Sequence, residues 1–287
     1  MTFRLAAEDV RQLSHLLAAA LSDNGDARKQ AEASLADLSS RPGYCAALLA
    51  VLQHPEVEVS TKWQAVVQLK NACSSRWMQR SRPGESSALS DAEKQHIRDH
   101  ILQLVGLPDT KLAVHVAVII SRIARHDFPG RWPALFTQLA APLQQPGSAS
   151  ELVLKRTWLT LHHVIKELAA KRLPADKRRL QELAAQLLPS VWHAWQAGAQ
   201  AFAAAVQPAA AAGSDIDSSQ ASRAEQWMLE CKVLRRLIMN GVPRCAPSLS
   251  TLTSCWFWTR RVANGIAQWL RRTVSSARTV AMHVPKA

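Results

Sequence analysis

LAVHVAVIISRIARHDFPGRWPALF, residues 112–136, is the stretch that decides the fold class. Pro129 and Gly130 divide it into two parts. Apolar side chains in the first part recur at the three- and four-residue intervals of one helix face, at Leu112, Val116, Ile119, Ile120 and Ile123. The stretch therefore predicts two helices joined by a short turn, with Arg131 and Trp132 in the joint.

The same helical spacing covers most of the chain. Further apolar stripes fall at residues 10–21, 31–38, 48–52, 65–77, 97–105, 133–139, 154–168, 180–202 and 227–238. No segment alternates cleanly with period two, so strands are not expected. The tetrapeptides SDAE (90–93) and SASE (148–151) match the capping box that opens a helix. Pro133 and Pro174 suit the first turn of a helix, where the missing amide proton costs nothing.

The predicted helices fall into pairs, which restart near residues 7, 60, 109, 150 and 222. A helical hairpin recurring every roughly 40 to 50 residues is typical of α-solenoids of HEAT or armadillo type. One hairpin cannot cover its own apolar face, so neighbouring hairpins must stack. We therefore expect an all-α fold, an α-solenoid of HEAT-type helical hairpin repeats that forms part of a truncated superhelix.

The character of the sequence changes at Val242. Residues 1–241 are expected to form one domain of about four and a half repeats, with a flexible insertion at 206–221. Residues 242–287 hold seven Lys/Arg and no acid, and no clear helical stripe, so a disordered or aberrant basic tail is expected. A misjoined exon, an intron read as coding sequence and a genuine isoform tail all fit this stretch.

The net charge of +13 raises the question of nucleic-acid binding. Residues 1–241 carry 28 Lys/Arg against 22 Asp/Glu, or +6, so half the excess lies in the tail and no specific nucleic-acid partner is expected. No apolar run approaches about 18 residues, and MTFRLAAEDV has acids where a signal peptide is apolar. Neither a membrane partner nor secretion is expected. Five scattered cysteines without a CxxC pair favour reduced thiols in the cytosol or nucleus.

Motifs for enzyme chemistry are missing from the sequence. His162-His163 followed by Glu167 is not HExxH, and adjacent helical histidines point about 100° apart. The glycines form neither GxGxxG nor GxxxxGK[ST], so no nucleotide cradle is predicted. No Cys–His or Ser–His–Asp arrangement follows from the spacing. We therefore expect a non-enzymatic protein with no catalytic residue, metal or cofactor.

Several segments together resemble one family. TKWQAVVQLKNACSSRW (61–77) resembles the importin-β N-terminal signature, with its L-K-N step and closing Trp. Residues 112–136 resemble the third-repeat signature of that family, an apolar helix ending in A-x-x-D-x-P-x-x-W-P. Residues 156–180 and LECKVLRRLIMNG (229–241) resemble the importin-eleven branch of the karyopherins. The resemblance covers roughly residues 5–241 and stops at Val242.

The resemblance implies a nuclear transport receptor, a HEAT-repeat solenoid of the importin-β (karyopherin-β) family. Members bind the GTP form of the small GTPase Ran through the second helices of the first three pairs, and hold protein cargo further along. On this sequence those helices are expected at about 26–38, 91–105 and 133–142. The resemblance also implies nucleoporins as partners, a monomer, and a location in cytoplasm and nucleus. Family members are about three times longer, so later repeats are absent from this sequence.

Candidate Ran-binding residues are charged side chains that the apolar stripes leave on other helix faces. They are Arg28, Lys29, Asp37, Lys94 and Arg98. Periodicity predicts only that these side chains are free, whereas a role in binding Ran is implied by the resemblance. A solvated surface would have the same composition.

Family-motif residues are expected to be mainly structural. They are Trp63, Lys70, Asn71, Trp77, Asp127, Pro129, Arg131, Trp132 and Pro133. The tryptophans either seal hairpins or contact a partner, and Lys70-Asn71 is expected to lie at a helix end, where the amide satisfies free backbone groups. Arg131 is expected to bridge to Asp127 or to carbonyls of the preceding helix, unless it meets a partner carboxylate.

Alternative functions remain open at this point. A HEAT-repeat scaffold that does not bind Ran is the main alternative, and a basic nucleic-acid binder is a third class. The basic residues at 171–172 and 177–179 suit a solvated turn, a contact with acidic cargo or Ran, or a nucleic-acid patch.

Overall fold

The computed structural model describes residues 7–78, 89–144, 149–212 and 217–241, and in these ranges every regular element is a helix. The elements are α1 (Ala7–Ala19), α2 (Gly25–Ser39), α3 (Tyr44–Gln53), α4 (Val59–Arg76), α5 (Asp91–His100), the 3₁₀ helix η1 (Ile101–Gly106), α6 (Thr110–Asp127), α7 (Leu135–Gln144), α8 (Glu151–Ala169), α9 (Pro174–Ala212) and α10 (Ser218–Gly241). The all-α prediction is confirmed. The chain divides into two units, Met1–Leu168 and Ala169–Ala287. The predicted tail, 242–287, lies outside the described residues.

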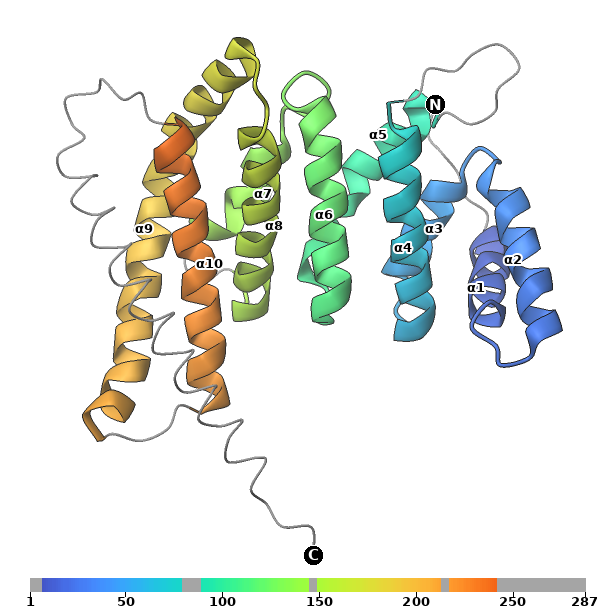
Figure 1. The fold of residues 1–287 in the computed structure, drawn as a ribbon, viewed down its shortest axis with the longest axis horizontal. Helices are drawn as coiled ribbons and strands as arrows, with labels where there is room; N and C mark the ends of the chain where they lie inside the picture. Colours follow the sequence, from blue (N-terminus) through green and yellow to red (C-terminus); the bar gives the residue numbers. More distant parts are fainter. Residues whose placement is uncertain (1–6, 79–88, 145–148, 213–216, 242–287) are drawn as a thin grey trace, which may run out of the picture. The chain divides into compact units, whose positions relative to one another are not determined.

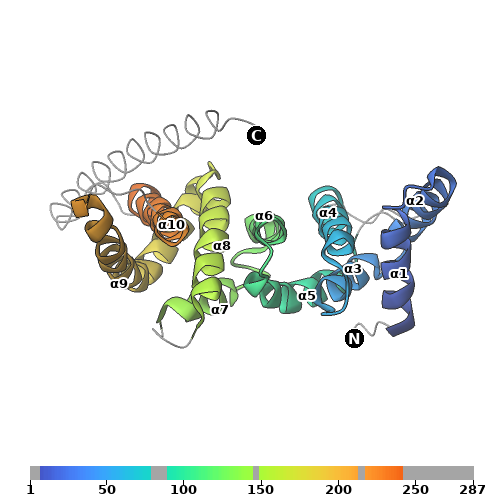
Figure 2. The ribbon, with the colours of Figure 1, turned by 90° about the horizontal axis from the view of Figure 1, so that it is seen from below.

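The first unit is a stack of helical hairpins in two layers (Figure 1). α1 packs on α2, α3 on α4, and η1, which continues α5, on α6. Between hairpins, α3 packs on α5 while α4 packs on α6. Figure 2 shows the result from below, with α4, α6 and α8 in one layer and α3, α5 and α7 in the other.

The predicted order of pairing is wrong by one helix after the first hairpin. Residues 59–76 were expected to open a pair with 91–105, but α4 packs on α3 before it and on α6 after it. The second helices of the first three pairs are therefore α2, α4 and α6, and α5 and α7 are first helices. Periodicity identifies a helix and its apolar face, but it does not tell which neighbour covers that face.

Helix starts are set by local hydrogen bonds and prolines. The Ser90 hydroxyl accepts the N–H of Glu93 at 3.2 Å, which confirms the cap of α5. α8 begins one residue after Ser150, whose hydroxyl accepts the N–H of Val153 at 3.3 Å, whereas the predicted cap residue Ser148 lies outside the described residues. Pro174 opens α9 as predicted, whereas α7 begins at Leu135, two residues after Pro133.

Apolar burial holds the first unit together. α3 (YCAALLAVLQ) has no charged residue, because α1, α4 and α5 surround it, and its Leu48, Leu49 and Leu52 are fully buried. The stripe of α6 is equally buried at Ile119 and Ile120. Each such side chain contributes about 1.5–3 kcal/mol relative to an exposed one. The stripes read from the sequence are thus the core of the unit.

The second unit contains the hairpin of α9 and α10, which pack along each other (Figure 1). Aromatic rings join them: Phe202 and Trp227 stack with centroids 4.9 Å apart, and the Trp195 indole donates to the Cys231 sulfur at 3.3 Å. Within the insertion expected at 206–221, residues 206–212 belong to α9 and residues 218–221 to α10, and its flexibility stays a prediction. Residues 213–216 lie outside the described part.

A buried carboxyl group lies in the same hairpin. Glu230 on α10 is 2% exposed and faces Gly198 on α9, where an added Cβ would lie 2.1 Å from its Oε2. Oε1 accepts a hydrogen bond from Gln226 at 3.1 Å, and Oε2 has no partner among the described residues. Burial raises the pKa of Glu230 to about 7, against smaller lowering effects of Gln226 and Arg223. The glycine at 198 makes room for this group.

Candidate protein-interaction surface

The second helices α4 and α6 carry charge of one sign. α4 has Lys62, Lys70 and Arg76 and no acid. α6 has Lys111, Arg122 and Arg125, and its one acid, Asp127, is buried. Among the described residues, no carboxylate lies within 4.0 Å of the amine or guanidinium nitrogens of Lys62, Lys70, Lys111 or Arg122. We call the exposed faces of these two helices the α4–α6 surface.

Trp63 is the aromatic centre of the α4–α6 surface. Its half-buried ring meets His115 edge-on, with centroids 5.1 Å apart, and the Lys111 ammonium lies 5.9 Å from its centroid. Partial burial, and then the charge of Lys70, lower the pKa of His115. The imidazole is therefore held neutral at neutral pH, and the positive charge of the surface comes from its lysines and arginines.

Hydrogen bonds between neighbouring helices of one layer fix two cations. The Arg122 guanidinium donates to the Ser74 hydroxyl, which ties α6 to α4. Arg125 donates to the Glu167 carboxylate and backbone carbonyl, both at 3.2 Å, which ties α6 to α8. These contacts hold two guanidinium groups in place on partly exposed faces.

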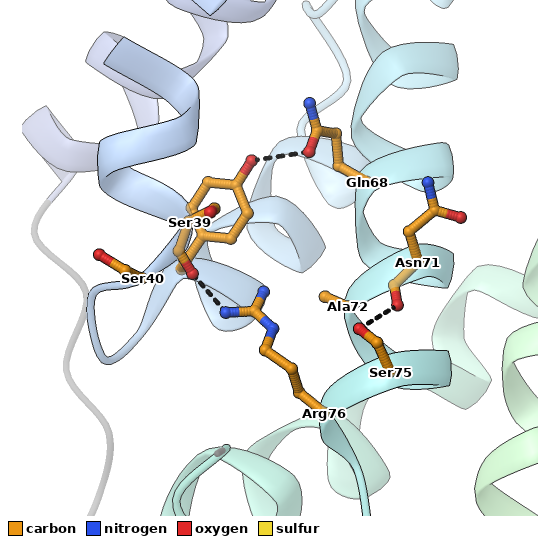
Figure 3. A pocket seen from close by; sticks show the side chains of 8 residues that line it. Ser39, Ser40, Gln68, Asn71, Ala72, Ser75 and Arg76 are labelled. Carbon is orange, nitrogen blue, oxygen red and sulfur yellow. Dashed lines mark hydrogen bonds between the residues drawn. The ribbon is translucent and has the colours of Figure 1, made fainter. Parts of the chain in front are cut away.

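A polar hollow of about 480 Å³ borders the same surface (Figure 3). It lies between the end of α2, the start of α3 and the second half of α4. Its lining residues are Ser39, Ser40, Tyr44, Gln68, Asn71, Ala72, Ser75 and Arg76. The Tyr44 hydroxyl donates to Gln68 Oε1 at 3.3 Å, and burial raises the pKa of Tyr44 to about 12, so the phenol stays protonated.

Two of the predicted Ran-binding residues are buried. Lys94 and Arg98 are each 6% exposed on α5. Arg98 donates to the Asp127 carboxylate at 2.6 Å and to Gln95 at 2.7 Å, and Lys94 lies 3.8 Å from the Asp91 carboxylate. The expectation that these side chains are free is wrong, because α5 lies between its neighbours in the layer and its cations face protein.

Arg28, Lys29 and Asp37 are exposed on α2, as predicted. Asp37 accepts a hydrogen bond from Arg41 at 2.6 Å on the surface of the unit. α2 is a second helix, so these three residues keep the position that the resemblance assigns to Ran binding. Contact with Ran stays a prediction for each of them.

The motif tryptophans differ in burial. Trp77 and Trp132 are 3% and 5% exposed and pack in the core, whereas Trp63 is half-buried on the α4–α6 surface. Lys70 and Asn71 are not at a helix end, because α4 continues to Arg76. The expected capping role of the Asn71 amide is therefore wrong, and its side chain is exposed.

The joint between α6 and α7 is closed by backbone hydrogen bonds. The Asp127 carbonyl accepts the N–H groups of Arg131 and Trp132 at 2.7 and 3.1 Å. The exposed Arg131 side chain lies 4.0 Å from Asp91 on α5, so the predicted bridge to Asp127 is wrong. Asp127 pairs with Arg98 instead. Pro129 is half-buried and Pro133 is exposed.

Glu93 is a connecting residue that sequence reasoning missed. Its buried carboxylate accepts the N–H groups of Gly43, Cys45 and Ala46 at 3.2, 2.8 and 3.2 Å. It thereby satisfies the free donors at the start of α3 and ties α5 to that helix. Leu89, Glu93 and Ile97 follow at four-residue intervals, so the sequence did place this acid on the apolar stripe.

The basic cluster of 171–179 is partly paired within the second unit. Asp176 lies 3.2 Å from the Lys171 ammonium and 3.8 Å from the Arg179 guanidinium. Arg172, Lys177 and Arg178 are exposed. The three predicted roles of the cluster stay open.

Two other kinds of site have no candidate in the described part of the chain. Among the described residues there is no group of three His, Cys, Asp or Glu that could hold a metal ion. No helix in that part of the chain is long and apolar enough to cross a membrane.

Comparison with curated proteins gives importins and importin beta-like proteins as relatives. Residues 31–106 match the family model of the Importin-beta N-terminal domain. Importin-11 of Mus musculus is 30% identical over 226 residues, which cover 79% of this chain and 22% of Importin-11. The importin beta-like protein kap113 of Schizosaccharomyces pombe is 33% identical over 170 residues, or 59% of this chain and 17% of kap113. The chain thus spans about a fifth of the length of these relatives.

Solved structures with the same fold agree. Lph2, described as a bidirectional nuclear transport receptor in S. cerevisiae, superposes with a TM-score of 0.62 at 24% identity, over 82% of this chain and 21% of Lph2. The exportin Cse1 in its cargo-free state gives 0.67 at 18% identity, over 82% of this chain and 24% of Cse1. These likenesses confirm the predicted HEAT-type solenoid. With the domain match and the identity to Importin-11 and kap113, they show that the chain belongs to the importin-beta family, near the importin-11 branch.

Proposed function

We propose that this chain acts as a nuclear transport receptor whose first unit binds Ran-GTP. The observation that carries the proposal is the Importin-beta N-terminal domain at residues 31–106, which includes the end of α2 and all of α3, α4 and α5. Relatives with the same fold are described as a nuclear transport receptor and an exportin. Protein cargo and nucleoporins are the further partners, and the chain would act as a monomer in cytoplasm and nucleus.

The binding face is proposed to be the exposed side of α2, α4 and α6. The resemblance assigns Ran to the second helices of the first three pairs, and the packing identifies those helices as these three. The α4–α6 surface supplies unpaired cations around a half-exposed Trp63, a combination that favours contact with a protein partner. The buried Arg98 ties α5 to Asp127 at the end of α6.

Nucleotide dependence distinguishes this function from that of a scaffold. The full chain is titrated with Ran loaded with a non-hydrolysable GTP analogue and, in parallel, with Ran loaded with GDP. The expected result is saturable binding of the GTP form and at least about tenfold weaker binding of the GDP form, a difference of about 1.4 kcal/mol. Isothermal titration calorimetry measures both affinities.

The alternatives predict other results. Equal binding of the two Ran forms, or binding of neither, would contradict the proposal and favour a HEAT-repeat scaffold. A basic nucleic-acid binder would instead bind duplex DNA or RNA with an affinity that falls steeply as salt rises. Its charge excess lies half in residues 242–287, so removal of that stretch would abolish such binding.

A further inference from the structure

The hollow beside α4 contains a cation without a counter-charge. The Arg76 side chain, partly exposed, donates to the Ser39 carbonyl and lies 3.9 Å from the Cys45 sulfur, and neither group carries a negative charge. Burial raises the pKa of Cys45 to about 12, so the thiol is protonated. Among the described residues, no carboxylate oxygen lies within 4.0 Å of the Arg76 guanidinium. A guanidinium has five N–H donors, so capacity for a further acceptor is left.

The rest of the lining consists of neutral hydrogen-bonding groups. Ser40 and Asn71 are exposed at its rim, and Gln68 is held by Tyr44 on the far wall (Figure 3). The Ser75 hydroxyl, also at the rim, donates to the Asn71 carbonyl at 2.9 Å. The Ser39, Ser40 and Ser75 hydroxyls already donate to backbone carbonyls, so the exposed Asn71 amide is the group that can add a hydrogen bond to an anion paired with Arg76.

Two helix ends limit the charge that the hollow accepts. α2 ends at Ser39 and α4 at Arg76, so both helices direct the negative ends of their dipoles toward it. A doubly charged phosphate meets repulsion from both ends. The start of α3 also borders the hollow, but the N–H groups of Gly43, Cys45 and Ala46 there already donate to the Glu93 carboxylate and are not available to an anion. A single carboxylate carries one negative charge, which one guanidinium neutralises, so a carboxylate is favoured over a phosphate at this site.

The charge around the hollow also favours a negatively charged partner. Lys70 on α4 and Arg122 on α6 extend the positive surface, and the exposed residues of these two helices include no acid. An acidic protein surface is therefore complementary to this face as a whole.

We propose that the hollow receives the carboxylate of an Asp or Glu side chain from the protein that binds the first unit, with Arg76 as its ion-pair partner. The inference rests on the proposed function, in which that protein is Ran-GTP. Binding of this carboxylate desolvates a partly buried guanidinium and adds a charge-assisted hydrogen bond at the edge of the interface.

Two matched substitutions at Ser75 test the proposal. Ser75→Asp places a carboxylate at the rim, where it competes for Arg76 and repels the incoming acid, whereas Ser75→Asn keeps the size without the charge. We expect Ser75→Asp to weaken binding of Ran loaded with the GTP analogue by about tenfold, because a hydrogen bond to a charged group is worth about 1.5–3 kcal/mol. Ser75→Asn should stay within about twofold of the unmodified chain.

Arg76 and a remote arginine complete the experiment. Arg76→Gln is expected to weaken binding by about tenfold, and Arg11→Gln, on the exposed face of α1, to leave it unchanged. Thermal unfolding of each variant shows whether the fold is kept. If the unmodified chain binds and Ser75→Asp binds equally well, the inference is overturned and the proposed function stands. If the unmodified chain does not bind Ran-GTP, both are overturned.

Discussion

Replacement of Asp127 by Ala is expected to lower the free energy of unfolding by about 3–5 kcal/mol. The Asp127 carboxylate accepts the Arg98 guanidinium at 2.6 Å, with the two side chains 3% and 6% exposed. Removal of the acid leaves a buried cation whose side-chain partner, within the described ranges, is Gln95 alone. Because the pair joins α5 to the end of α6, the loss is expected to loosen the support of the α4–α6 surface as well.

Two further variants show whether burial causes this effect. Asp37→Ala removes the exposed ion pair with Arg41 and is expected to cost under about 1 kcal/mol. The double substitution Arg98→Met with Asp127→Leu removes both charges and is expected to recover most of the loss. Urea unfolding followed by circular dichroism measures all three. If Asp127→Ala costs no more than Asp37→Ala, the pair does not stabilise the unit.

Glu230→Gln is expected to stabilise the chain at pH 8 by up to about 3 kcal/mol, with a much smaller effect at pH 5. The pKa of Glu230 is raised from 4.5 to about 7 by burial, so between these values the folded chain binds more protons than the unfolded chain. Stability contributed by this group therefore falls as pH rises from about 4.5 to 7, and stays at its lower value above that. Glutamine is neutral at every pH in this range, is nearly the same size as glutamate and can still form hydrogen bonds.

The comparison of the two chains isolates this group. Other titrating residues contribute equally to both, so the difference between their urea unfolding midpoints at each pH reports on residue 230. The account predicts a difference that grows from pH 5 to pH 7 and then stays constant. A difference independent of pH, or a variant less stable than the unmodified chain at pH 8, would show that burial does not raise the pKa of Glu230.

Periodicity predicted the helices well and their pairing poorly. Most of the stripes named from the sequence lie within a helix. A helix is the conformation that brings apolar residues at 3.6-residue spacing onto one face, where they can be buried together. The pairing depends on which helix covers which face, and the α4 stripe is covered on both sides, by α3 and α6. The sequence contains no local signal for that choice. The connection between α4 and α5, longer than that between α3 and α4, was the available hint.

Charged residues on apolar stripes explain the errors in the candidate site. Arg98 precedes the buried Ile101 and Val105 by three and seven positions, and so lies on their stripe. Its charge favours an exposed position, and its partner Asp127 lies 29 residues away and cannot be found by spacing. The exposed residues of α2 needed no such partner, so their positions were predicted correctly.

The most direct measurement is hydrogen exchange of the full chain with and without Ran loaded with the GTP analogue. The account predicts slower exchange in peptides from α4 (Val59–Arg76) and α6 (Thr110–Asp127), with little change in α5 (Asp91–His100) and α7 (Leu135–Gln144). Ran loaded with GDP should leave all four helices unchanged. Slower exchange confined to α5 and α7, or none in α4 and α6, would contradict the assignment of the binding face.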